Sequence, residues 1–410
     1  MAEEKAGPDA ARAAARAWLD ENWHGTDDRT YVAALVASGW AAPTWPAEWY
    51  GRGLDRAAAT AAVAEFEAAG APRAGQDLAG FHAGPWLHLM GNPLHAYGSD
   101  ELKHEFLPRL LTGEVGVGCL LYSEPGAGSD LAGLQTRAER EGDEYVINGQ
   151  KIWTTGGKDA QYGLLIARTD WDVPKHAGLS FFIIDMRQPG IEVRPIRQIT
   201  GDADFNETYL TDARVPAAWM IGKPGEGWKA LQVALAAERS GMGAMASAKS
   251  GAEQRAGLRG AAGELIEAAR TAGRLDDPLV RDEIVKLMSW RLTNTWTGQR
   301  AAAEIRRGSS SLASLGKLAM SRVLHGSADF AYRMRGEESL VYDYDDPAGY
   351  PVDRELMFSF INSIGGGSDQ IQRNIISERV LGLPKGFEPD KGVPFRDVRK
   401  GAATRTVSQV

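Results

Sequence analysis

Apolar residues recur at helical spacing through the first part of the chain, in runs such as ARAAARAWLDENW, YVAALVASGW and RAAATAAVAEFEAAG. Side chains three or four positions apart share one face of a helix, and the Ala and Glu in these runs favour helix. The pattern predicts a helical block from Pro8 to about Leu111. Proline and glycine interrupt it near Pro43 and Gly53, which indicates a loop between helices.

At about Gly116 the pattern changes to short runs rich in β-branched and aromatic residues, such as EYVINGQKIWTT, YGLLIART, LSFFIIDM and ETYLTDARV. These runs predict a β domain that extends to Pro224. The pair Asn148-Gly149 predicts a hairpin turn of type I′, because that turn needs positive φ at both central residues.

Helical periodicity returns from Gly225 to about Leu383, and its long runs with short breaks predict an antiparallel helix bundle. The residues that follow are rich in charge, Pro and Gly, and predict a loose tail. We therefore predict an α+β chain of three domains and a tail. They are an N-terminal helical domain (residues 1–115), a middle antiparallel β domain (116–224), a C-terminal four-helix bundle (225–385) and the tail (386–410).

Composition excludes several classes of protein. The 410 residues carry 46 Lys and Arg against 54 Asp and Glu, a net charge of -8. Without clustered positive charge we expect neither a nucleic-acid nor a membrane partner. The single cysteine, Cys119, excludes an intramolecular disulfide and a CxxC site, and the seven histidines lack metal-ligand spacing, so we predict no metal. The acidic N-terminus has no unbroken apolar stretch, which predicts a cytoplasmic protein.

The most informative stretch is LLYSEPGAGSDLAG, in which an apolar strand runs into a glycine-rich loop from Ser123 to Asp130. Glycines let the backbone approach a flat or anionic ligand closely, and the hydroxyls of Ser123 and Ser129 can hydrogen-bond to it. Taken alone, the same loop is equally consistent with a simple turn between strands. The common nucleotide, zinc-protease and serine-hydrolase motifs are absent from the sequence.

Four segments carry a resemblance to a known family. Ser123–Asp130 matches the pattern Ser/Thr-Glu-x-x-Ala-Gly-Ser-Asp, and Asn148–Thr155 matches Asn-Gly-x-Lys-x-Trp-x-Thr. The run GGGSDQIQRNIISERVLGLP, Gly365–Pro384, looks like a Gly-Thr-Ser-Glu-Ile-Gln ending, and GWAAPTWPAEWYGRGL looks like an N-terminal pattern of the same family. These segments span most of the chain and follow one another in the family's order, so the sequence resembles the acyl-CoA dehydrogenase family.

The resemblance implies FAD, held between the β domain and the C-terminal bundle. It implies that Leu120, Tyr122 and Ser123 line the isoalloxazine ring, and that Trp153 and Thr155 face its N5 side. The other residues that it implies for FAD are Gly128, Ser129, Arg270, Ser368 and Gln370, with Ser129 also near the substrate. For Trp153 a core position in a hairpin is the alternative.

The family oxidises acyl-CoA thioesters to trans-2-enoyl-CoA: a carboxylate takes the α-proton, FAD takes the β-hydride at N5, and hydrogen-bond donors polarise the thioester oxygen. Many relatives carry the base just before the Gly-Thr-Ser segment, where this chain has Gly366. A second class carries it on the first long helix of the C-terminal domain, where this chain has Glu238. We therefore expect Glu238 as the base and the Gly366 N–H as the donor, with Arg239 orienting the carboxylate or contacting coenzyme A. A solvated, arginine-paired Glu238 is the alternative.

Two family motifs that reach a neighbouring subunit's FAD are altered. Arg270 alone remains of Arg-x-x-Phe-Gly, and YRMRGEES stands in place of Gln-x-x-Gly-Gly. This departure resembles the actinobacterial type that assembles from two different subunits. We expect a dimer, a tetramer or a heterotetramer with a related subunit, and an electron-transfer flavoprotein as acceptor. A non-catalytic or half-site subunit, or altered flavin chemistry such as desulfination or oxygenation, stays open, and acyl chain length and branching are not predicted.

Overall fold

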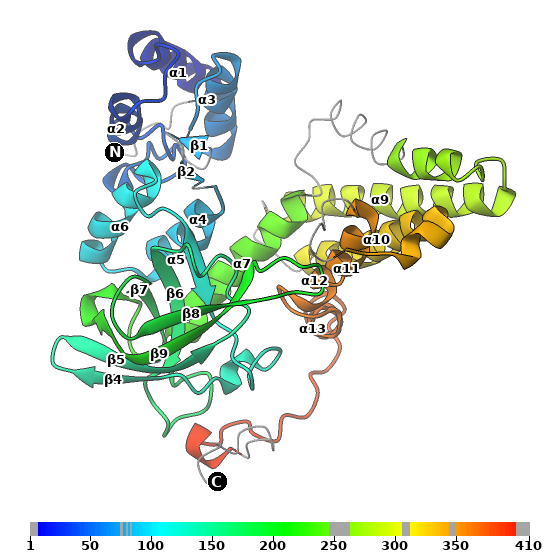
Figure 1. Ribbon diagram of the computed structural model, residues 1–410. Helices are drawn as coiled ribbons and strands as arrows, with labels where there is room; N and C mark the ends of the chain where they lie inside the picture. Colours follow the sequence, from blue (N-terminus) through cyan, green and yellow to red (C-terminus); the bar gives the residue numbers. More distant parts are fainter. Residues whose placement is uncertain are drawn as a thin grey trace. The chain divides into compact units, whose positions relative to one another are not determined.

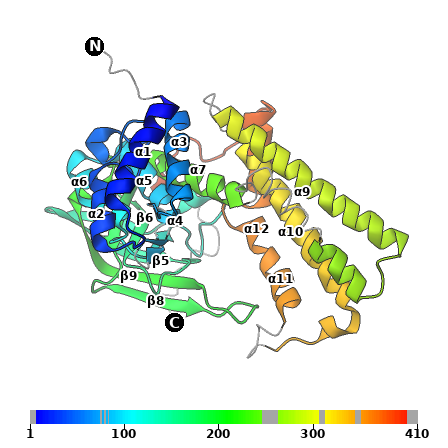
Figure 2. The same cartoon turned by 90° about the horizontal axis from the view of Figure 1, so that it is seen from above.

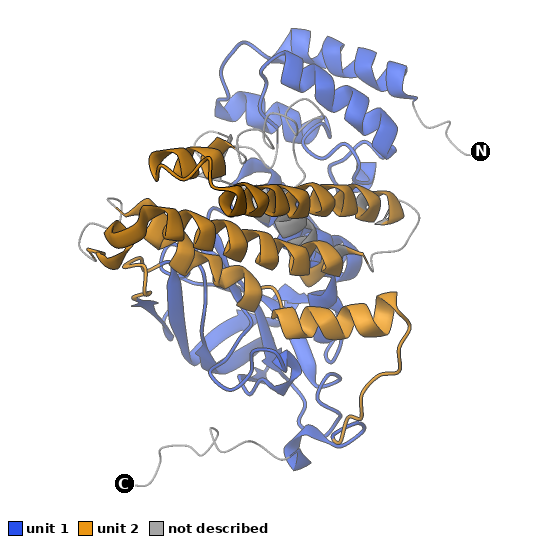
Figure 3. Ribbon diagram, turned by 90° about the vertical axis from the view of Figure 1, so that its right-hand side faces the viewer, with its two compact units in different colours: residues 1–196, 204–234, 390–410 blue, residues 197–203, 235–389 orange. Residues whose placement is uncertain are grey.

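The computed structural model describes residues 7–73, 77–78, 81–82, 84–245, 263–305, 312–343 and 350–398. The chain divides into two compact units (Figure 3). Unit 1 comprises residues 1–196, 204–234 and 390–410, and unit 2 comprises residues 197–203 and 235–389. Helices and a large sheet together confirm the predicted α+β class. Within the described ranges, no helix is long and apolar enough to cross a membrane.

Unit 1 begins with a group of helices, as predicted (Figure 1). They are α1 (Pro8–Asn22), α2 (Arg29–Ala37), α3 (Arg56–Ala68), α4 (Gly84–Leu89), α5 (Gly91–Tyr97) and α6 (Asp100–Thr112), with the short paired strands β1 (Asp77–Leu78) and β2 (Phe81–His82) between α3 and α4. Asp28 and Asp55 begin α2 and α3, because each carboxylate accepts a backbone N–H of the first turn. α1 packs against α3, and alanines such as Ala15 and Ala62 fill the buried positions, which allows close approach of the two helices.

The rest of unit 1 is a sheet in the order β10-β7-β6-β4-β5-β9-β8, with β3 paired to β6. The strands are β3 (Gly118–Leu121), β4 (Arg137–Glu141), β5 (Glu144–Lys151), β6 (Tyr162–Arg168), β7 (Leu179–Asp185), β8 (Ile191–Ile196), β9 (Phe205–Pro216) and β10 (Met220–Ile221). Most pairs are antiparallel, as predicted, but β3 and β4 pair in parallel with β6. The side chains of Leu121, Ile147 and Leu165 lie fully buried in one apolar core of this sheet.

The prediction of a hairpin turn at Asn148-Gly149 is wrong. β5 runs straight through both residues, with a β-bulge opposite β9, and the turn from β4 to β5 lies at Gly142, where φ is +61°. Asn148 instead pairs across the bulge with Asp212, which has φ +51°. Gly149 is needed because a Cβ there would lie 2.4 Å from Thr136 Oγ1. Close packing therefore explains the Asn-Gly pair better than turn geometry does.

Unit 2 is helical, as predicted for the C-terminal domain. Its described elements are the end of α7 (Gly227–Met245), a helix at 263–271, α9 (Pro278–Ile305), α10 (Ala313–Arg335), α11 (Pro351–Ser359), α12 (Ile361–Ile364) and α13 (Asp369–Ile375). α9 and α10 lie side by side and antiparallel (Figure 2), since Glu283 pairs with Arg333 and Arg291 donates to Ser327 at 2.9 Å. Gly326 permits the close contact, because a Cβ there would lie 2.7 Å from Leu287.

The segment at residues 393–398, here called the C-terminal strap, is docked on unit 1. The Phe395 N–H donates to the Val173 carbonyl at 2.9 Å, and the Arg396 N–H donates to the Trp171 carbonyl at 3.0 Å. The Phe395 ring is 3% exposed and covers the Arg168 guanidinium at 3.4 Å. The prediction of a loose tail is therefore wrong for these residues, because one buried aromatic side chain and two backbone hydrogen bonds hold them on unit 1.

Phe395→Leu is expected to loosen the loop at residues 169–177. The leucine loses the cation–π contact with Arg168, an interaction of about 2 kcal/mol when desolvated. Amide hydrogen exchange across residues 169–178, followed by mass spectrometry, is expected to become about tenfold faster. Phe387→Leu is the matched control, since Phe387 is 93% exposed, and it is expected to change nothing. Equal exchange in the two variants would contradict the role of the strap.

Candidate active site

The structure brings the glycine-rich loop and the Trp153 segment together within unit 1. The Ile152 N–H donates to the Ser123 carbonyl at 2.9 Å, and Lys151 Nζ donates to the Tyr122 carbonyl at 3.1 Å. The end of β3 therefore lies against the end of β5. Two sequence motifs about 25 residues apart in the chain form one continuous surface.

A buried ion pair joins these two segments. Lys151 is 0% exposed, and its Nζ lies 2.9 Å from Glu124 Oε1. Glu124 also accepts the backbone N–H groups of Gln135 at 2.6 Å and Thr136 at 2.9 Å. Burial alone would raise the pKa of Glu124, but the Lys151 ammonium and these hydrogen bonds hold that pKa below its usual value. Burial lowers the pKa of Lys151, and Glu124 opposes this shift. Each group is the other's hydrogen-bonded counter-ion, and this contact favours the charged form of both.

Trp153 presents its ring outward from this surface. Its side chain is 57% exposed, and its backbone is left-handed, with φ +64°. The edge of the ring contacts Phe205, with ring centroids 6.0 Å apart and planes at 89°. This excludes the alternative of Trp153 as a core residue. An exposed indole that is fixed on one side suits a flat aromatic ligand on the other.

The loop at residues 125–130 is open to solvent at its glycines. The Glu124 and Ala127 backbones exchange two hydrogen bonds of 3.0 Å, which closes a tight turn. A Cβ added at Gly126 or Gly128 would meet no heavy atom within 4 Å, so the space above both is free for a ligand. Ser129 is exposed beside them.

The other residues predicted for FAD in unit 1 lie on or beside this surface. Leu120 is half-buried on β3, Tyr122 is 7% exposed and packs on Phe181, and Thr155 is exposed just after Trp153. The open glycine loop and the outward indole suit a flat ligand such as a flavin, and Ser123, Ser129, Trp153 and Thr155 stay the residues predicted to hold it in this unit.

Unit 2 contributes a glycine turn between α12 and α13. Gly366 and Gly367 have φ +63° and +87°, a conformation that side chains rarely adopt. The buried Gln372 amide donates to the Gly366 carbonyl at 3.1 Å and so fixes the turn. Ser368 begins α13, since its hydroxyl accepts the Ile371 N–H, and Gln370 is exposed. Gly366 is half-buried in a turn of fixed geometry.

A buried polar cluster supports this turn from α10. Lys317 is 2% exposed, and its ammonium hydrogen-bonds to the Asn362 carbonyl on α12. Ser321 donates to Asp369 at 2.7 Å, at the start of α13. The cluster therefore ties the helices on both sides of Gly366 to one helix of the bundle.

The remaining predicted residues are placed less completely. Glu238 and Arg239 belong to α7, and their side chains lie outside the described part of the structure. Arg270 lies on the helix at 263–271, where it is exposed and paired with Glu267. An exposed pair of this kind contributes little stability, so Arg270 is free to exchange partners.

Sequence reasoning missed two features of the site. The Glu124–Lys151 pair had a partial signal, because the first motif carries two carboxylates and the second carries one lysine, but the sequence does not show which carboxylate is buried beside the lysine. The buried Asn206, which hydrogen-bonds to Thr154, had no signal in the sequence, because a single Asn in a strand is typical of an exposed position.

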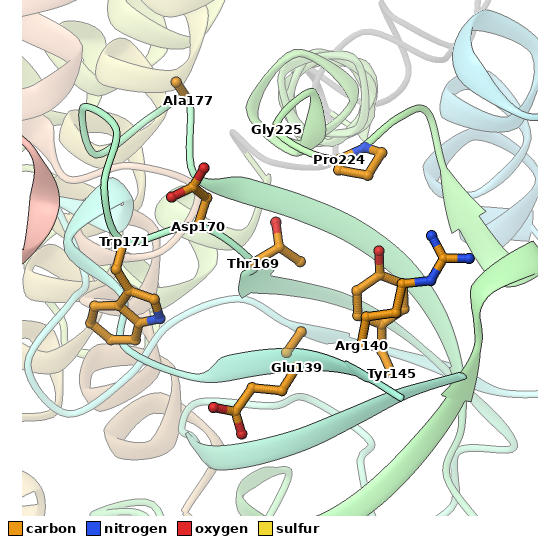
Figure 4. Close-up of a pocket in the computed structure, with 10 residues that line it drawn as sticks. Glu139, Arg140, Tyr145, Thr169, Asp170, Trp171, Ala177, Pro224 and Gly225 are labelled. Atoms are coloured by element: carbon orange, nitrogen blue, oxygen red, sulfur yellow. The ribbon is translucent and has the colours of Figure 1, made fainter. Parts of the chain in front are cut away.

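A separate cavity of about 480 Å³ lies at the other end of β4 and β5 (Figure 4). Trp171 and Asp170 lie on one side of it, and Tyr145 and Arg140 on the other. None of the described residues that line it belongs to the predicted FAD set. Its mixed polar and aromatic lining does not by itself specify a ligand.

The chain matches three models of one family along most of its length. Residues 2–114, 119–213 and 225–381 match the N-terminal, middle and C-terminal domains of acyl-CoA dehydrogenase. The acyl-CoA dehydrogenase IpdE1 of Mycobacterium tuberculosis is 36% identical over 403 residues, which cover 91% of this chain and 97% of that protein. The cyclohexane-1-carbonyl-CoA dehydrogenase of Geobacter metallireducens is 31% identical over 298 residues, covering 70% of this chain and 74% of that protein.

Solved structures give the same result. The Tcur3481–Tcur3483 steroid ACAD superposes with a TM-score of 0.68 and 26% sequence identity. The match covers 93% of this chain and 99% of that chain. A chain of the ChsE4–ChsE5 complex from Mycobacterium tuberculosis superposes with a TM-score of 0.64 and 27% sequence identity. The match covers 94% of this chain and 100% of that chain.

The chain therefore belongs to the acyl-CoA dehydrogenase family. It is an oxidoreductase similar to mycobacterial members of the family, its cofactor is FAD, and acyl-CoA thioesters are its substrate class. The resemblance, the fold, the enzyme class and the cofactor that the sequence predicts are confirmed.

Proposed function

We propose that this enzyme removes one proton from Cα and one hydride from Cβ of an acyl-CoA thioester, giving the trans-2-enoyl-CoA. When bound, FAD supplies the hydride acceptor. Glu238 takes the α-proton as general base, and the Gly366 N–H donates to the thioester oxygen, where negative charge develops. Arg239 orients the Glu238 carboxylate or contacts coenzyme A.

One observation carries this proposal: the joined surface of Ser123 and Trp153, with an open glycine loop beside an outward indole. Such a surface suits a flat, anionic cofactor. The left-handed Gly366 supports the donor role, because only the backbone N–H can act at a residue without a side chain. An electron-transfer flavoprotein would be the electron acceptor.

A panel of thioesters tests the reaction and its acyl specificity. The flavin-loaded protein is assayed with straight-chain, branched and steroid-side-chain acyl-CoA, using an artificial electron acceptor and mass spectrometry of the product. We expect a product two hydrogens lighter than the substrate. Oxygen uptake without an enoyl product would instead indicate altered flavin chemistry, and would contradict the proposal.

A second candidate function is a half-site subunit of a heteromeric dehydrogenase. Two observations favour it: Gly366 offers no carboxylate, and the similar structures include the ChsE4–ChsE5 complex of two components. In this case a related subunit completes the site, and the assembly is a heterotetramer. Without it, we expect a dimer or tetramer of this chain.

Flavin released and counted per subunit distinguishes the two candidates. Near-stoichiometric FAD with turnover by the chain alone identifies a self-sufficient dehydrogenase. Little flavin and no turnover, both restored by an unlike homologous subunit that copurifies, identifies the half-site subunit.

A further inference from the structure

The backbone at Trp153 is held in a conformation that it would not adopt unaided. A positive φ brings the Cβ of an L residue close to its own peptide group, and tryptophan has no side-chain group that compensates locally. Such a conformation persists only where the surroundings determine it, and it is concentrated at functional sites. The φ of +64° at Trp153 therefore requires a specific restraint nearby.

Asn206 supplies that restraint at the next residue, Thr154. The Thr154 N–H donates to the Asn206 carbonyl at 3.0 Å, and the Asn206 N–H donates to the Thr154 carbonyl at 3.1 Å. Asn206 Nδ2 donates a further bond to the same Thr154 carbonyl at 2.8 Å, and one to the Asp204 carbonyl at 3.1 Å. One residue thus makes three of the bonds that fix the peptide groups around Thr154.

The burial of Asn206 indicates that its side-chain carboxamide is there to donate the two Nδ2 hydrogen bonds. The residue is 0% exposed, and its Oδ1 is buried without a hydrogen-bond partner among the described residues. A buried acceptor without a partner is unfavourable. The Nδ2 contacts fix the orientation of the amide, because both neighbouring groups are carbonyl oxygens that only a donor can face.

We propose that Asn206 is a positioning residue for the active site: its carboxamide holds the Thr154 carbonyl and thereby fixes the left-handed turn that points the Trp153 ring outward. Phe205, the preceding residue, contacts the edge of the same ring. Two consecutive residues of β9 thus hold the backbone and the ring of Trp153. The catalytic consequence rests on the proposed function, whereas the conformational one does not.

Fluorine NMR of protein labelled with 5-fluorotryptophan tests the conformational claim without flavin or substrate. Trp153→Phe identifies the Trp153 resonance among the 12 tryptophans. In Asn206→Ala we expect this resonance to shift or split while the others stay in place. Asn206→Ser, which has one donor instead of two, gives the same change if the alanine variant does not fold. An unchanged Trp153 resonance in a folded Asn206 variant would overturn the proposal.

Asn148→Ala is the matched control. Asn148 also joins β5 to β9, through Asp212, but this pair is exposed and lies at the β-bulge, before the turn, with no hydrogen bond to Thr154 in the described part of the structure. We expect the Trp153 resonance to stay unchanged in this variant. A shift as large as that of Asn206→Ala would mean that any loosening of the strand pair moves Trp153, and would overturn the specific role of Asn206.

The flavin-loaded enzyme tests the catalytic consequence separately. We expect Asn206→Ala to lower kcat by about 10-fold to 100-fold with little change in KM, because a misplaced site group slows the reaction more than it weakens binding. A shifted Trp153 resonance with unchanged kcat would overturn the catalytic part. If the wild-type protein forms no enoyl-CoA, the proposed function fails, while the NMR result still decides the role of Asn206.

Discussion

Glu238→Gln is expected to lower the rate constant for flavin reduction by acyl-CoA by about 10²-fold to 10⁴-fold, the range that a general base contributes. Glutamine keeps the size of the side chain and its place on α7, but its amide cannot accept the α-proton. Stopped-flow absorbance under anaerobic conditions measures the rate constant directly. FAD content and KM are expected to change little, because the proposed role is in proton transfer.

Glu264→Gln is the control for this substitution. Glu264 is an exposed glutamate of the same unit, and its replacement is expected to leave the rate constant unchanged. Flavin reduction at the wild-type rate in Glu238→Gln would show that Glu238 is a solvated helix residue. The base would then have to come from another residue or from a partner subunit.

Lys151→Met is expected to destabilise unit 1 by about 3–5 kcal/mol, because it leaves the carboxylate of Glu124 buried without its counter-ion. The same change removes the donor to the Tyr122 carbonyl and so loosens the surface that is predicted to face the flavin. Thermal unfolding and FAD content measure both effects. Lys158→Met, at an exposed lysine of the neighbouring turn, is expected to change neither.

The double variant Glu124→Gln with Lys151→Met separates the charge from the packing. Removing both charges is expected to recover much of the stability, because neutral groups of similar size leave no uncompensated charge. A double variant as unstable as the sum of the two single variants would contradict the importance of the pair.

The pair also predicts a direction for the pH dependence of stability. The pKa of Glu124 lies below its usual 4.5 in the folded state, so its contribution is present above about pH 4.5 and is lost as the pH falls through the lowered value. We expect the wild type to lose stability in this acidic range more steeply than the double variant does. Parallel pH profiles would mean that Glu124 is not charged in the folded protein.

The sequence predicts the order of helical and β regions because the periodicity of each region is long and regular. The helices near Pro8 and Arg56 begin where Pro or an Asp cap predicts a start. The motif at Ser123–Asp130 and the segment at Trp153 are predicted as parts of the site by their resemblance to the family's motifs, because residue type alone is equally consistent with a simple turn.

The errors have a common physical cause, which is contact between segments that are distant in sequence. Gly149 is a glycine because Thr136 packs against it, and Phe395 is ordered because it covers Arg168. Asn206 acts on Thr154 across a strand pair. Local patterns carry no information about such partners, so the sequence predicts a turn at Asn148-Gly149 and a loose tail at the strap.

The most direct test of the central claim is a single anaerobic turnover with an acyl-CoA deuterated at Cα and Cβ. The flavin-loaded protein is mixed with this thioester, and flavin absorbance and product mass are followed together. We predict that the flavin absorbance decreases in a single phase while the thioester loses one deuterium from each carbon, as D⁺ from Cα and as deuteride from Cβ. A thioester recovered with both carbons fully deuterated and the flavin still oxidised would contradict the assignment of this chain as the catalytic dehydrogenase.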